Sequence, residues 1–247
     1  VYARDLILTI IGMIGANGAN YMAMEFAGDG MKNLTISDRV AICNLCVEAG
    51  AKTALMEVDD ITLEYLKEHG REPKYSFKSD DDAKFAKVYD IDLSTIKPIV
   101  AKPHFVDSVV DATECLGVHI DEAFLGSCNN GRIEDLRVGA NILKGKKVNP
   151  LVRFLVVPAS QAVYEQALQE GLLKIFMDAG AIVMNPNCSV CWGSCQGVIG
   201  EGEVLISTGT RNFKGRAGSP DSFVYLASAA TVTASAIAGE ITTADRV

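Results

Sequence analysis

Ala181-Ile-Val-Met-Asn-Pro-Asn-Cys-Ser-Val-Cys-Trp-Gly193 and, upstream, Ala123-Phe-Leu-Gly-Ser-Cys-Asn-Asn-Gly-Arg132 are the two stretches on which the fold prediction depends. In each, a short apolar run predicts a strand (Ala123 to Ser127, Ala181 to Met184), and a cysteine-bearing turn follows directly. The two turns hold a lone cysteine and a C-x2-C pair. Three thiols suit a [4Fe–4S] cluster in which one iron lacks a protein ligand. Such an iron is a Lewis acid and can activate a hydroxyl group.

Strands and helices alternate around these stretches. Further strands are expected at Val152–Val157 and Val204–Ser207, and helices at Arg132–Leu143, Ser160–Gly171 and Leu226–Ala238. This alternation predicts an α/β fold with mostly parallel sheets. Because residues after the carboxyl ends of parallel strands gather in one crevice, the cysteine turns are expected to converge there.

The loop after Val204–Ser207 contains two arginines, Arg211 and Arg216, in a glycine-containing segment. Either arginine alone is typical of a surface charge. Two guanidinium groups in a loop that reaches the same crevice are suited to bidentate binding of carboxylates. The sequence therefore predicts an anionic, carboxylate-bearing ligand beside the cysteines.

Cys195 leaves a second interpretation open. It lies four residues after Cys191, and with Cys128 it would complete a four-thiolate site for an electron-transfer or cluster-carrier module or for structural zinc. The three-cysteine interpretation is favoured because Trp192-Gly-Ser194 is expected to begin a helix that carries Cys195 away. A purely structural or partner-binding fragment with empty thiols is the third alternative.

The first part of the chain is predicted to form a helix over Asp5–Ile14 and another over Asp38–Glu48, capped by Ser37. Asn44 and Glu48 are four residues apart and would share a face of the second helix. A strand over Thr53–Val58 and a helix capped at Asp59 follow. Two prolines make Ile96–Pro103 resemble an extended linker, so we place a domain boundary between residues 1–96 and 97–247.

Bulk composition excludes several classes of protein. The chain has 247 residues and a net charge of −8, which argues against a nucleic-acid or membrane surface. The seven cysteines, an odd number, indicate reduced thiols in the cytoplasm rather than a secreted disulfide framework. The first residue, Val1, is not an initiator methionine, which suggests a fragment or a longer chain.

Three motifs in this order resemble the aconitase superfamily of iron–sulfur hydro-lyases. They are Leu125-Gly-Ser-Cys-Asn-Asn-Gly-Arg-Ile-Glu-Asp-Leu136, Cys188-Ser-Val-Cys191 and Arg211-Asn-Phe-Lys-Gly-Arg216. The resemblance is greatest to the large-subunit branch that contains 3-isopropylmalate dehydratase, homoaconitase and 2,3-dimethylmalate dehydratase. It implies two three-layer α/β domains, the second (residues 1–96, incomplete at its N-terminus) and the third (residues 97–247) of that subunit.

The resemblance also implies roles for individual residues. Cys128, Cys188 and Cys191 would hold the [4Fe–4S] cluster, and its open iron would bind a hydroxy di- or tricarboxylic acid. Arg211 and Arg216 match arginines that bind the substrate. Ile42-Cys-Asn-Leu-Cys-Val-Glu48 resembles a further family motif that would set Asn44 beside the cluster and Glu48 within reach of the hydroxyl at the open iron.

The resemblance further implies dehydration and rehydration of the hydroxy acid in leucine biosynthesis, with the identity of the acid left open. Two residues depart from the family pattern, Asn129 (commonly threonine) and Thr210 (commonly asparagine). The first domain of the large subunit, with its histidine and aspartate motifs, has no counterpart in the chain. A small subunit carrying a swivelling domain and the catalytic serine would be the partner, and the chain alone is predicted to be inactive.

Overall fold

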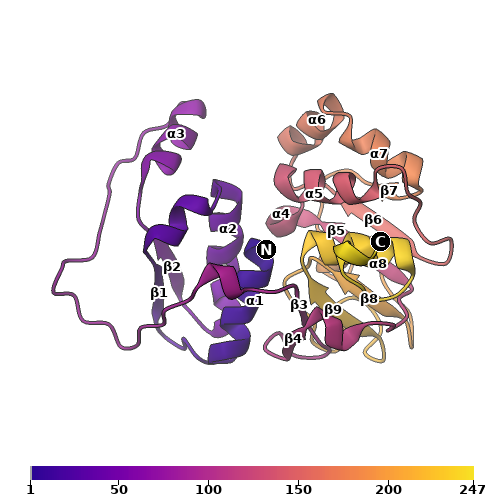
Figure 1. The fold of residues 1–247 in the computed structure, drawn as a ribbon, viewed down its shortest axis with the longest axis horizontal. Helices are drawn as coiled ribbons and strands as arrows, with labels where there is room; N and C mark the ends of the chain where they lie inside the picture. The colour runs from indigo at the N-terminus through magenta and orange to yellow at the C-terminus, as the bar shows by residue number, and fades with distance from the viewer. Residues whose placement is uncertain (1) are drawn as a thin grey trace.

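The N-terminal part of the chain builds a small sheet covered by helices. The computed structural model describes residues 2–247. Strands β1 (Ala23–Phe26) and β2 (Thr53–Met56) pair in parallel, and the helices are α1 (Ala3–Ile14), α2 (Ile36–Leu45) and α3 (Asp60–Glu68). Figure 1 shows this group, in indigo and purple, with α1 on the side that faces the rest of the chain.

The remaining elements build a seven-stranded sheet in the order β4-β3-β9-β8-β5-β6-β7. The strands from β9 to β7 are parallel, and β3 and β4 extend the sheet as antiparallel strands. This arrangement confirms the predicted α/β fold with a mostly parallel sheet. The strand bounds are β3 Ile99–Ala101, β4 Val109–Asp111, β5 Glu122–Gly126, β6 Arg153–Val157, β7 Ile182–Val183, β8 Val204–Ser207 and β9 Phe223–Ala227.

Both faces of the large sheet are covered. The helices after β5 are α4 (Ser127–Asn130), α5 (Ile133–Leu143), α6 (Gln161–Gln169), α7 (Leu172–Ala179) and α8 (Ala229–Ala238). Alternate residues of β5 follow the strand period: Ala123 and Leu125 pack in one apolar core with α5 and α8, and Phe124 packs in another core with Leu8 of α1. Helix α1 therefore belongs to the small sheet and also covers a face of the large one.

The segment predicted as a linker, Ile96–Pro103, is in fact part of the sheet. Its residues Ile99–Ala101 form β3, which pairs with β4 on one side and β9 on the other. Val100 and Ala101 are fully buried. The proposed boundary near residue 96 thus lies just before the first strand of the large sheet.

Two further details correct the prediction. The stretch Leu226–Ala238 is not one helix, because Phe223–Ala227 forms the parallel strand β9 and α8 begins after Ser228. Thr35, rather than Ser37, caps α2: its hydroxyl accepts the Asp38 N–H, while the Asp38 carboxylate accepts the Thr35 N–H.

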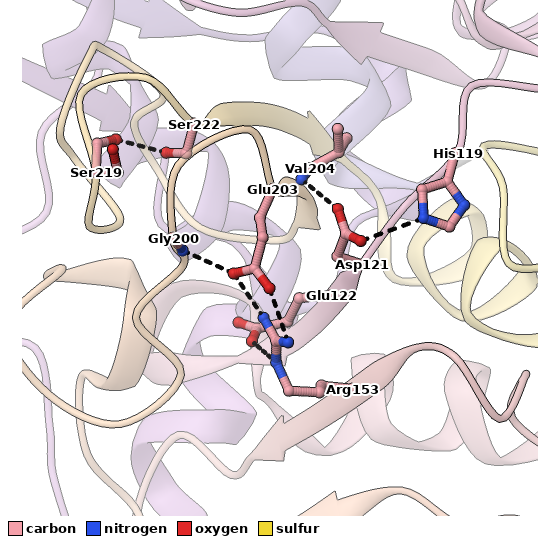
Figure 2. Close-up of polar contacts among 9 residues, drawn as sticks. All are labelled: His119, Asp121, Glu122, Arg153, Gly200, Glu203, Val204, Ser219 and Ser222. Carbon is pink, nitrogen blue, oxygen red and sulfur yellow. Dashed lines mark hydrogen bonds and ion pairs between the residues drawn. The ribbon is translucent and has the colours of Figure 1, made fainter.

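An ionic network ties together the amino-terminal ends of β5, β6 and β8 (Figure 2). Arg153 donates from Nε to the buried Glu122 carboxylate at 3.0 Å and makes two hydrogen bonds of 3.0 and 2.9 Å to Glu203. Glu203 also accepts the Gly200 N–H at 2.7 Å. Since Gly200 ends the segment that begins with the C-x2-C pair, this network fixes one end of that segment.

Within residues 2–247, none of the helices combines the length and the apolar composition that crossing a bilayer demands.

Candidate functional site

The site lies where the chain reverses direction across the sheet. From β5 the chain proceeds to β6 and β7 on one side, and then returns to β8 and β9 on the other. This makes the β5–β8 junction a topological switch point, the usual position of a ligand crevice in such sheets. Gly126 at the end of β5 donates its N–H to the Thr208 hydroxyl, just past the end of β8, at 2.9 Å. The loops after β5 and β8 therefore leave the sheet side by side.

Cys128 lies on the one-turn helix α4, directly after β5. The preceding residue, Ser127, has a φ of 63°, which is uncommon for a residue with a side chain. Two glycines allow the turn to approach β6: a Cβ added at Gly126 or Gly131 would lie 2.6 or 2.3 Å from the Val157 carbonyl oxygen. Cys128 is exposed.

Cys188 and Cys191 follow β7 in a short 3-10 turn, Ser189–Cys191. Ser189, between the thiols, also has a positive φ, 44°, and its hydroxyl donates to the Gln196 carbonyl at 2.9 Å. Backbone strain of this kind persists where the surroundings hold it, often at functional sites. Cys188 is exposed and Cys191 half-buried, against Gly209 of the loop after β8.

Cys188 and Cys191 are close enough to Cys128 to raise the pKa of its thiol. Burial raises the pKa of Cys128, and the charges of Cys191 and Cys188 raise it further. Within residues 2–247, no three histidine, cysteine or acidic side chains are grouped as ligands of a single metal ion. A [4Fe–4S] cluster instead spreads its thiolates over separate corners of a cube. Three cysteines from two loops at one sheet edge are a donor set that fits this larger group.

Asn44 reaches this edge from the N-terminal part of the chain. Its Nδ2 donates to Asn129 Oδ1 at 3.0 Å, and Asn129 Nδ2 donates to Asn130 Oδ1 at 2.9 Å. Asn129 and Asn130 are buried, at 2 and 3% exposure. Because both follow Cys128 on α4, the amide chain fixes α2 against the cysteine turn.

Glu48 and Arg211 form an ion pair between the two parts of the chain. Arg211 Nε donates to Glu48 Oε1 at 2.8 Å. Glu48 lies on the 3-10 helix Cys46–Ala49 rather than on the α-helix predicted for it, because α2 ends at Leu45. The terminal nitrogens of Arg211 make no hydrogen bond to any part of the chain that the structure describes, so they remain available to a ligand.

Arg216 and Cys195 have fewer contacts at the site. The Arg216 guanidinium lies 5.6 Å from the centre of the Phe213 ring, and its buried Nε has no hydrogen-bond partner among residues 2–247. Gly193 packs on the Arg216 backbone, which places the two loops together. Cys195 is exposed, past the turn that holds Cys188 and Cys191.

Sequence reasoning missed Arg4. This arginine of α1 is 1% exposed and donates from Nη1 to Asn130 Oδ1 at 3.2 Å and from Nη2 to the Gly209 carbonyl. One feature of the sequence could have indicated it: Arg4 and Asp5 are charged residues at the start of an apolar helix. Because burying a charge without a partner is costly, such residues are expected to have polar partners. Nothing in the local pattern identifies the loops they meet.

This chain is similar to one family of known proteins. The model of the aconitase family (aconitate hydratase) matches residues 1–117 and 109–239. A probable 3-isopropylmalate dehydratase large subunit from Methanothermobacter thermautotrophicus is 52% identical over 98% of this chain and 58% of its own length. The 3-isopropylmalate dehydratase large subunits of Caldicellulosiruptor saccharolyticus and Acetivibrio thermocellus are 49 and 48% identical, over 96 and 99% of this chain. The chain spans 56 to 58% of the length of these relatives.

Proposed function

Because this chain belongs to the aconitase family, we propose that it is part of the large subunit of an iron–sulfur hydro-lyase. The proposed reaction is dehydration and rehydration of a hydroxy dicarboxylic acid, and the relatives favour 3-isopropylmalate and hence leucine biosynthesis. Cys128, Cys188 and Cys191 are the proposed ligands of a [4Fe–4S] cluster.

The observation that carries the proposal is the convergence of two cysteine loops and an arginine loop at the β5–β8 switch point. The charges of Cys188 and Cys191 raise the pKa of Cys128, as expected for thiols gathered at one place. The arginine loop adds Arg211, whose partner Glu48 comes from the other part of the chain. A thiolate set, a guanidinium and a carboxylate together suit a carboxylate-bearing substrate at a cluster.

In the proposed reaction, the cationic and anionic side chains of this chain would have different roles. When bound, the cluster supplies a Lewis-acidic iron that makes a hydroxyl group a better leaving group. The terminal nitrogens of Arg211 are oriented by the Glu48 bond and would bind a substrate carboxylate, with Arg216 as the second proposed cation. Glu48, 12% exposed, would accept a hydrogen bond from the departing hydroxyl, and Asn44 would hold the cysteine turn beside it.

A proton must also leave the carbon next to that hydroxyl. General acid–base assistance of this kind contributes roughly 10²–10⁴-fold. We assign the base to the proposed partner, a small subunit, and expect the remaining length of the relatives to supply further groups. A cytoplasmic location is proposed with this assignment, since reduced thiols are needed for the cluster.

The first experiment is anaerobic reconstitution of the chain with ferrous iron and sulfide, followed by desalting and chemical analysis of both. We expect the wild type to retain iron and sulfide in about equal amounts, approaching the composition of a [4Fe–4S] cluster. Cys128→Ser should lose most of both, and Cys115→Ser, a buried cysteine outside the site, is the matched control.

In the same assay, Cys195→Ser distinguishes the hydro-lyase from the electron-transfer alternative. Retention of the cluster in Cys195→Ser supports three ligands and an open iron. Loss equal to that of Cys128→Ser would instead favour a four-thiolate electron-transfer module. Turnover of 3-isopropylmalate is then measured after the chain is combined with the remaining large-subunit sequence and a small subunit; the chain alone should show none.

A further inference from the structure

Arg4 is a buried cation at the junction of the two parts of the chain. It lies on α1, with 1% of its surface exposed, and its Nε has no hydrogen-bond partner within residues 2–247. A buried guanidinium is costly unless it is paired or hydrogen-bonded. The two hydrogen bonds that Arg4 does make both go to cysteine-bearing or cysteine-contacting loops.

The first hydrogen bond joins Arg4 to the Cys128 turn. Nη1 donates to Asn130 Oδ1 at 3.2 Å, and Asn130 follows Cys128 on the single turn of α4. Asn130 in turn accepts from Asn129, which is bonded to Asn44. Arg4 is therefore the end of the polar chain that fixes this turn.

The second hydrogen bond joins Arg4 to the neighbourhood of Cys191. Nη2 donates to the Gly209 carbonyl, and a Cβ added at Gly209 would lie 3.6 Å from Cys191 Sγ. One planar guanidinium thus contacts the loop after β5 and the loop after β8, on which Cys191 packs. A planar fork with fixed donor directions sets the spacing between the two loops in a way that a flexible ammonium does not.

The charge of Arg4 also has the sign that a thiolate cluster requires. Burial lowers the pKa of Arg4 to about 10, and Cys191 is the largest of the charges that oppose this shift. Arg4 is therefore cationic at neutral pH. Three thiolates repel one another, and a buried cation near Cys191 lowers the electrostatic cost of holding them together.

We propose that Arg4 is a positioning residue for the cluster: its guanidinium bridges the Cys128 and Cys191 loops and offsets the negative charge of their thiolates. This inference rests on the proposed function, because it supposes the cluster. It adds that cluster binding depends on α1, far upstream of every ligand in the sequence.

The test compares Arg4→Gln, Arg4→Lys and wild type after anaerobic reconstitution, in the chain as it stands. Arg4→Gln should retain about tenfold less iron and sulfide after desalting, the usual effect of losing a residue that orients metal ligands. The cluster that remains should have a more negative reduction potential, measured by a redox titration followed by electron paramagnetic resonance, because a nearby positive charge is gone. A purely structural role would leave that potential unchanged.

Arg39→Gln is the matched control. Arg39 is also buried in the N-terminal part, at 5% exposure, but it pairs with Asp59 at 2.6 Å, and within residues 2–247 none of its hydrogen bonds goes to a cysteine loop. The Arg39→Gln variant should be less stable than wild type, and the reduction potential of its cluster should be unchanged. Should Arg4→Gln fail to fold, Arg4→Lys decides: several-fold faster loss of iron than wild type supports the bridging role, and an equal rate overturns it.

The outcomes also separate this inference from the proposed function. If wild type and Arg4→Gln hold the cluster equally, at the same potential, Arg4 has no positioning role and the proposed function stands. If the wild type assembles no cluster while its thiols are reduced, the proposed function fails and the inference fails with it.

Discussion

Glu48 and Arg211 are 163 residues apart in the sequence and meet at 2.8 Å across the junction of the two parts of the chain. Asn44 and Asn129 meet in the same region at 3.0 Å. Both pairs join the α2 region to loops at the carboxyl edge of the large sheet. The candidate site is thus built by the whole chain, and its geometry depends on how the small sheet and its helices are docked.

The Glu48–Arg211 pair should contribute measurably to that docking. Glu48 is 12% and Arg211 43% exposed, so part of the attraction is screened by water. In a double-mutant cycle with Glu48→Ala and Arg211→Ala, urea unfolding should give a coupling free energy of about 0.5–1.5 kcal/mol. The Arg137–Glu170 pair, on the outer surface of one part, is the control. A coupling of zero for Glu48–Arg211 would show that the pair plays no part in docking.

Asn129→Thr is expected to destabilise this chain, although threonine is common at this position in the family motif. The substitution removes an amide that accepts from Asn44 and donates to Asn130, in a place with 2% exposure. Loss of these buried hydrogen bonds should lower the free energy of unfolding by about 1–3 kcal/mol. Asn185→Thr, at an exposed position, should change it by less than about 0.5 kcal/mol. Calorimetry of the two variants checks the difference.

Gly126→Ala should disturb the Cys128 turn through simple crowding. A Cβ at Gly126 would lie 2.6 Å from the Val157 carbonyl oxygen and 2.8 Å from the Val157 Cβ, and backbone on both sides prevents an easy adjustment. We expect the free energy of unfolding to fall by about 1–3 kcal/mol, with weaker cluster retention. Gly200→Ala is the control, because its nearest neighbour is a side-chain oxygen 3.6 Å away. Equal stability of the two variants would contradict the close packing of the turn on β6.

The sheet strands that precede the cysteine and arginine loops could be predicted because their signals are local. Val204–Ser207 is a run of apolar and β-compatible residues bounded by turns, and β8 has these bounds. β3 could not be identified in this way, since it has three residues between prolines and is stabilised by β4 and β9. β9 was hidden because its apolar residues run on into the alanine-rich helix α8.

For the candidate site too, local features could be predicted from the sequence and long-range contacts could not. The thiols and Arg211 were predicted as site residues because each lies in a turn after a predicted strand, and their roles stay predictions. Their partners were not predicted, because the bond from Arg4 to Asn130 joins residues 126 positions apart. No local pattern encodes such a contact, which arises only when α1 packs on the large sheet. The prediction of Ser37 as the cap of α2 was wrong for a related reason: the reciprocal bonds with Asp38 that identify Thr35 as the cap are visible only in the structure.

Asp5, next to Arg4 on α1, should make the free energy of unfolding fall as the pH rises, which is the opposite of the usual effect of a carboxyl group. Burial raises the pKa of Asp5 to about 6 from its ordinary 3.8, although the N–H groups of Ile99 and Tyr2 donate to its carboxylate. The folded state therefore binds the proton more tightly than the unfolded state. The stabilisation from this group is fully present below about pH 4 and is lost as the pH rises through 6, by up to about 3 kcal/mol.

The measurement is the free energy of unfolding by urea between about pH 3 and 7, for wild type and Asp5→Asn. The advantage of wild type over Asp5→Asn should decline as the pH rises. Asp59 provides the opposite case, because its hydrogen bond with Arg39 holds the pKa of that carboxyl below its usual range. The advantage of wild type over Asp59→Asn should therefore grow as the pH rises through about 4. Parallel profiles for wild type and Asp5→Asn would show that the Asp5 carboxyl is not desolvated in the folded chain.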